Sequence, residues 1–110
     1  MKYPEVKNYI SGKFVEDNKN TLDVINPSDG VKLSTVPLSD KKDLDKAVKA
    51  ATAAYPAWSK MTIKERVQIF YKYKTLLEQN LDELATIVQE ENGKTIGESV
   101  AEVAKSVELT

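Results

Sequence analysis

Short runs in the first third of the chain alternate apolar and polar residues, as half-buried strands do. Residues 9–15 contain two such runs around Ser11 and Gly12, a pair that suits a tight hairpin turn because glycine accepts a positive φ. Residues 21–26 and 31–36 are two further strand candidates, and a proline follows each of them. The pattern therefore predicts a β-hairpin followed by a few short strands.

From residue 39 onwards, apolar residues recur at every third or fourth position, which is typical of amphipathic helices. The spacing predicts four helices. They cover about residues 41–58, 63–79, 81–92 and 96–110. Pro56 falls near the end of the first helix, so we expect the last turn of that helix to loosen or kink there.

Polar residues with the spacing of helix caps precede all four predicted helices. They are Ser39 or Asp40, Thr62 with Glu65, Asn80, and Thr95 with Glu98. Asn92 and Gly93 predict a left-handed cap at the end of the third helix, because glycine readily adopts the backbone conformation that such a cap needs.

The fourth predicted helix shows no stop signal. Its apolar positions, Ile96, Val100, Val103 and Val107, continue to the last residues without a glycine, a proline or a basic last turn. Short strands with one apolar face also need a partner surface to be stable. Both features favour a chain that is part of a longer fold.

Composition narrows the function. The 110 residues carry a formal charge of −1 and contain no cysteine and no histidine. Near-neutral charge argues against a nucleic-acid or anionic membrane partner, and no apolar run is long enough to span a membrane. No signal-peptide pattern is seen, so we expect a cytoplasmic location. Without a thiolate, an imidazole or a phosphate-binding glycine loop, we assign no catalytic and no cofactor-binding residue.

Charged residues near the ends of the last two helices are the candidates that remain. Glu90 and Glu91 with Lys94 indicate either a charged site or an ordinary solvated helix end. Lys105 is a candidate for an anionic ligand, but it lies three residues after Glu102 on one helix face and can instead pair with it.

Five short motifs follow one another along almost the whole chain. They are Asn8–Val15, Val24–Pro27, Ala57–Ser59, Glu65-Arg66 and Glu91–Thr95. In this order and at these spacings they resemble the start of aldehyde dehydrogenases. The residues that follow, 101–106, are most similar to the methylmalonate-semialdehyde dehydrogenase group. Succinate-semialdehyde and non-phosphorylating glyceraldehyde-3-phosphate dehydrogenases are near alternatives.

The fold class expected is α+β, with a hairpin and strands within about residues 8–36 followed by the four helices. The resemblance implies an incomplete part of the α/β aldehyde dehydrogenase fold. Residues 1–38 would form a strand arm, and residues 39–110 a helical part that flanks the cofactor-binding domain of a longer parent enzyme. The chain itself would be structural and inactive. The alternative is a stand-alone helical protein-interaction module.

The resemblance also implies the chemistry of the parent enzyme, which oxidises a small aldehyde, a semialdehyde, to an acid or an acyl-CoA. NAD or NADP would be its cofactor, and CoA a further reactant in some members, with none expected to bind this chain alone. The expected partners are the remainder of the parent enzyme and further copies of it in a homo-oligomer. Which aldehyde is used, whether NAD or NADP takes part, and whether CoA is needed all stay open.

Three residues of this chain match supporting positions of that family. A backbone carbonyl near Ile25 and the carboxylate of Glu91 would hold a monovalent cation, for which such oxygen ligands are suited. Lys105 matches the position at which semialdehyde members often place an arginine that holds the anionic end of the substrate. Lysine keeps the charge of that arginine but loses its two-pronged hydrogen bonding.

Overall fold

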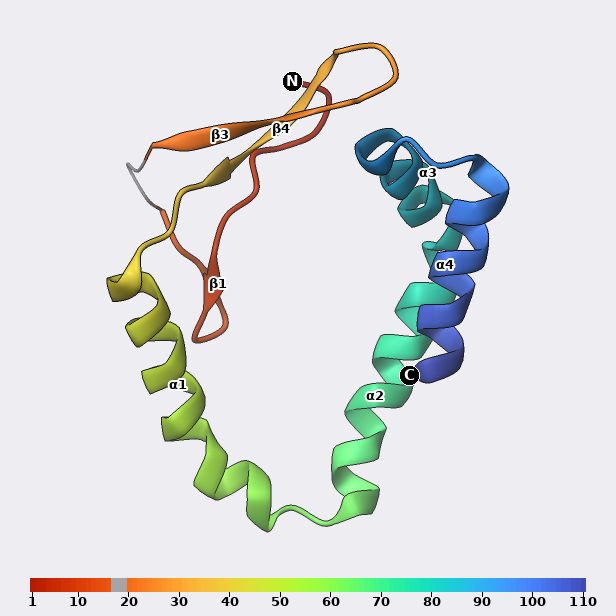
Figure 1. Cartoon of the computed structure of the whole chain (residues 1–110). Helices are drawn as coiled ribbons and strands as arrows, with labels where there is room; N and C mark the ends of the chain where they lie inside the picture. Colours follow the sequence, from red (N-terminus) through yellow and green to blue (C-terminus); the bar gives the residue numbers. More distant parts are fainter. Residues whose placement is uncertain (17–19) are drawn as a thin grey trace. The chain divides into compact units, whose positions relative to one another are not determined.

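The computed structural model describes residues 1–16 and 20–110, which form short strands and four helices (Figure 1). The strands are β1 (Tyr9–Ile10), β2 (Lys13–Phe14), β3 (Thr21–Ile25) and β4 (Lys32–Pro37), and the helices are α1 (Lys41–Lys60), α2 (Ile63–Gln79), α3 (Leu81–Asn92) and α4 (Ile96–Leu109). The expected α+β class is confirmed. Among these described residues, no helix is both long and apolar enough to cross a membrane.

Contacts between residues divide the chain into two units. One consists of Met1–Ile25 and Lys32–Lys60, and the other of Asn26–Val31 and Met61–Thr110. The loop between β3 and β4 therefore groups with helices α2, α3 and α4. The expected division into an arm and a helical part of one incomplete domain stays a prediction.

The β1–β2 hairpin turns at Ser11 and Gly12, as the sequence predicts. Both residues have a positive φ, 54° and 75°, which is the requirement of the two-residue turn whose twist matches that of the strands. In the resulting antiparallel register Tyr9 lies opposite Phe14. Their rings meet edge to face with centroids 5.0 Å apart, an arrangement that favours the closed hairpin.

β4 is the central element of the first unit. It pairs with β3 as an antiparallel strand on one side, and the N-terminal segment lies along its other side. The amides of Tyr3 and Val6 donate to the carbonyls of Leu33 and Thr35, each at 2.8 Å. Residues 33–35 are consequently buried. This pairing of the N-terminal segment is not predicted by the sequence pattern.

α1 is capped by Asp40 and not by Ser39. The Asp40 carboxylate accepts hydrogen bonds from two first-turn amides at 2.8 and 3.2 Å, and the Asp43 carboxylate accepts one from the Asp40 amide at 2.8 Å. The helix continues past Pro56 to Lys60, two residues beyond the predicted end. Pro56 has no amide proton, so the helix loses one hydrogen bond there. The residues after Pro56 keep their amide donors, and the helix can continue.

In the second unit, α4 packs against α2 and α3 (Figure 1). The capping boxes predicted at Thr62 and Thr95 are both present, and Gly93 ends α3 in the left-handed conformation with φ 80°. The predicted side-chain cap by Asn80 is wrong, because its Nδ2 donates to the Leu76 carbonyl at 2.8 Å. Asn80 is the single residue between α2 and α3. Its side chain donates to one of the unpaired carbonyls at the end of α2 and so does not cap α3.

The predicted apolar stripe of α4 faces its neighbouring helices. Val103 is buried, Val100 and Val107 are partly buried, and Ala85 of α3 is completely buried. Ile96, at the start of the stripe, stays exposed. The small core of the helical unit therefore lies between α3 and α4.

Candidate functional site

The candidate charged residues lie at the α3–α4 connection and along α4. Glu91 is in the last turn of α3 and is exposed. Lys94, in the connection, forms an ion pair with Glu102 of α4. Lys105 instead pairs with Glu108, at 3.4 Å between Nζ and Oε2. The predicted pairing of Lys105 with Glu102 is thus wrong, because Glu102 is bound by a lysine from the preceding connection, eight residues away.

The surroundings of Lys105 leave its charge accessible. Its side chain is 61% exposed, and its ion pair with Glu108 is long and within one helix. Exposed pairs of this kind contribute at most about 1 kcal/mol. An ammonium group has three donors, so an anion that approaches Lys105 from solvent can be bound without displacing a strong partner.

The cation hypothesis rests on two residues from different units. Ile25 is the last residue of β3 in the first unit, and Glu91 belongs to the second. Carbonyl and carboxylate oxygens fit the chemistry of a hard cation. The described residues contain no group of three or more acidic, histidine or cysteine side chains that could hold a metal ion. The cation site stays a prediction.

The start of α4 is fixed by an ionised cap. The Glu98 carboxylate accepts hydrogen bonds from the Thr95 amide and the Thr95 hydroxyl, each at 3.0 Å. These bonds, the amide first, lower the pKa of Glu98 below its ordinary value. Thr62 lowers the pKa of Glu65 at the start of α2 in the same way. Both carboxylates act as structural anions at helix N-termini, where negative charge is favourable.

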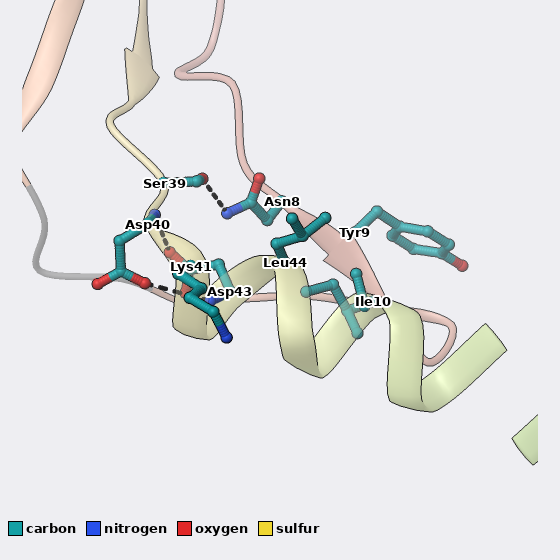
Figure 2. A pocket seen from close by; sticks show the side chains of 9 residues that line it. Asn8, Tyr9, Ile10, Ser39, Asp40, Lys41, Asp43 and Leu44 are labelled. Carbon is teal, nitrogen blue, oxygen red and sulfur yellow. Dashed lines mark hydrogen bonds between the residues drawn. The ribbon is translucent and has the colours of Figure 1, made fainter. Parts of the chain in front are cut away.

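A hollow of about 480 Å³ lies between the β1–β2 hairpin and the start of α1 (Figure 2). Tyr9, Ile10, Leu44 and Ala47 contribute apolar side chains to its lining. At its edge, Asn8 Nδ2 donates to Ser39 Oγ at 2.7 Å, which joins the hairpin to the α1 N-terminus (Figure 2).

None of the three predicted site residues lines this hollow, and the Ser39 hydroxyl at its edge is occupied by the hydrogen bond from Asn8. The hollow therefore has the properties of a packing surface. Sequence analysis did not identify it, although the Asp40-x-x-Asp43 spacing of its capping residues is a signal that can be seen in the sequence.

Comparison with known proteins places these features in a family. The family model described as "Aldehyde dehydrogenase family" matches residues 14–110. Malonate-semialdehyde dehydrogenase 1 of Bacillus thuringiensis (strain Al Hakam) is 44% identical over 104 residues, which are 94% of this chain and 21% of that protein. The chain thus spans about a fifth of the length of the curated relatives that it matches.

Solved structures give the same result. Lactaldehyde dehydrogenase from Escherichia coli matches with a TM-score of 0.92 and 28% identity, over 96% of this chain and 22% of that one. A candidate methylmalonate-semialdehyde dehydrogenase from Sinorhizobium meliloti 1021, complexed with NAD, matches with a TM-score of 0.87 and 33% identity, over 98% and 22%. The resemblance seen in the motifs is confirmed: the chain belongs to the aldehyde dehydrogenase family.

Proposed function

We propose that this chain is the N-terminal portion of an NAD(P)-dependent semialdehyde dehydrogenase. The observation that carries the proposal is the 44% identity, over 104 residues, to malonate-semialdehyde dehydrogenases. The complete enzyme oxidises a semialdehyde to an acid or an acyl-CoA and passes the hydride to NAD(P). These 110 residues contain no cysteine to attack the aldehyde, so their own role is structural.

The role of the chain is to supply strands and helices that flank the cofactor domain of the complete enzyme. Its cofactor is NAD or NADP, since one structural relative is complexed with NAD and another is an NADP-dependent enzyme. The complete enzyme assembles as a homo-oligomer and works in the cytoplasm.

Three residues of this chain have proposed supporting roles. Lys105 holds the anionic end of the substrate, supported by its exposed side chain and its weak partner Glu108. The Ile25 carbonyl and the Glu91 carboxylate hold a monovalent cation, supported by the oxygen chemistry of both groups. Glu91 is exposed, so its carboxylate can accept such a ligand.

The test begins with the coding sequence downstream of Thr110. An open reading frame that contains a cysteine and a cofactor-binding unit supports the proposal. The product of that frame is then assayed with malonate, methylmalonate and succinate semialdehydes, with NAD or NADP, and with or without CoA. A native stop codon after Thr110, or a full-length product that oxidises none of these aldehydes, would contradict it. A stop codon together with a defined protein complex would favour the interaction module instead.

A further inference from the structure

The loop Asn26–Val31 between β3 and β4 keeps its shape through its own hydrogen bonds. The Asn26 side chain accepts from the Ser28 amide at 2.8 Å, and the Asn26 carbonyl accepts from the Gly30 amide at 2.9 Å. The Asp29 side chain accepts from the Val31 amide at 2.9 Å. The Asn26 amide donates to the Val31 carbonyl at 2.9 Å and closes the loop. Such side-chain bonds are typical of preformed turns.

This loop groups with the helical unit, and its Pro27 lies against Gly93. A Cβ atom added at Gly93, the residue that ends α3, would lie 3.0 Å from Pro27 Cγ and 4.0 Å from Ser28 Oγ. The proline ring therefore rests directly on the backbone of Gly93. No side chain fits at position 93 unless the loop moves.

Gly93 is thus constrained in two ways, by its positive φ and by the close approach of Pro27. Gly12 shares only the first constraint. Gly93 has φ 80° and Gly12 has φ 75°, so an alanine would be strained at both. A Cβ at Gly12, however, would meet nothing within 4 Å. The need for a small residue is specific to Gly93, and it comes from Pro27.

We propose that Pro27 and Gly93 form a latch that docks the Asn26–Val31 loop on the α3–α4 connection. The loop docks on the backbone of Gly93, and both belong to the same chain. Lys94 and Thr95 follow Gly93 directly and bind Glu102 and Glu98 of α4. The latch therefore joins the loop to the connection that fixes the start of α4.

Hydrogen exchange of the complete 110-residue chain tests the latch, with the amides of Gly30 and Val31 as reporters. Gly93→Ala should speed their exchange about tenfold, because the hydrogen bonds within the loop open more often once Pro27 no longer rests on Gly93; a tenfold change corresponds to about 1.4 kcal/mol. The matched control Gly12→Ala introduces alanine at a similar φ in open space and should leave both amides unchanged. Equal acceleration by the two variants would overturn the latch.

Pro27→Ala removes the ring atom nearest Gly93 and provides a second test. Alone, it should also speed exchange at Gly30 and Val31. Combined with Gly93→Ala it should add little, because both changes break the same contact. Additive effects of the two changes would overturn the proposal. If Gly93→Ala does not fold, unchanged exchange in Pro27→Ala alone would overturn it as well.

Discussion

Lys105 is the residue through which this chain would touch a substrate. Its ammonium is exposed and pairs weakly with Glu108. In the full-length enzyme, Lys105→Met should raise KM for a carboxylated semialdehyde about tenfold, since a hydrogen bond to a charged group contributes about 1.5 kcal/mol or more. It should leave kcat nearly unchanged. Lys105→Arg should retain the low KM.

Steady-state kinetics with propionaldehyde, which has no anionic end, provide the control for Lys105. KM for that aldehyde should not change in Lys105→Met. The variant Lys41→Met, which removes another exposed helix lysine, should affect neither substrate. A rise in KM for both aldehydes alike would show that Lys105 acts on the fold and not on the anionic group.

Glu98 should make the stability of α4 depend on pH. Hydrogen bonds from Thr95 lower its pKa in the folded chain, whereas in the unfolded chain it has its ordinary value of 4.5. Its contribution is therefore fully present above about pH 4.5 and is lost as the pH falls through the lower folded pKa. Thermal unfolding followed by circular dichroism should show a smaller loss of stability between pH 6 and pH 3 in Glu98→Gln than in the native chain.

Glu83→Gln is the matched control for this pH effect. Glu83 also lies in the first turn of a helix, α3, but its helix has no side-chain cap. The pH profile of Glu83→Gln should follow that of the native chain. If Glu98→Gln lost stability with falling pH as steeply as the native chain, the cap would not be the source of the pH dependence.

Helix starts differ in how strongly a single side chain fixes them. Thr95 caps α4 through its hydroxyl, whereas the Asn80 side chain serves the end of α2 and leaves α3 uncapped. Thr95→Ala should lower the free energy of unfolding by about 1 kcal/mol, and Asn80→Ala by about half of that or less. Urea unfolding of both variants measures the difference. A larger loss in Asn80→Ala would mean that its side chain caps α3 in solution.

The elements could be predicted from the sequence where their signals are local. The Ser11-Gly12 turn, the capping boxes and the Gly93 cap each depend on residues within one turn of the chain. Lys94 and Glu102 lie eight positions apart, and Lys94 lies before the start of α4. The helix period therefore does not predict their ion pair. The contact of Pro27 with Gly93 spans most of the chain, so only the folded structure shows it.

Many large apolar side chains of the molecule are exposed to solvent. Tyr9 and Phe14 of the β1–β2 hairpin are 63% and 68% exposed, and Leu109 of α4 is 76% exposed. Large apolar side chains are thus exposed on the hairpin, whereas on α4 they are confined to the two ends of the helix, at Ile96 and Leu109. The buried apolar residues among those that the structure describes are Leu33, Ala85 and Val103, so little hydrophobic free energy offsets the loss of chain entropy.

The isolated 110-residue chain should therefore associate with itself or be only marginally stable. Sedimentation velocity at several protein concentrations should show that the average size of the species increases with concentration. Replacing Phe14 by serine should weaken this association, because it removes an exposed aromatic side chain whose ring contact is with Tyr9 of the same hairpin. Thr86→Ser, an exposed change on α3, is the control and should have no effect. A monomer with one sharp, cooperative unfolding transition would show that these residues need no partner surface.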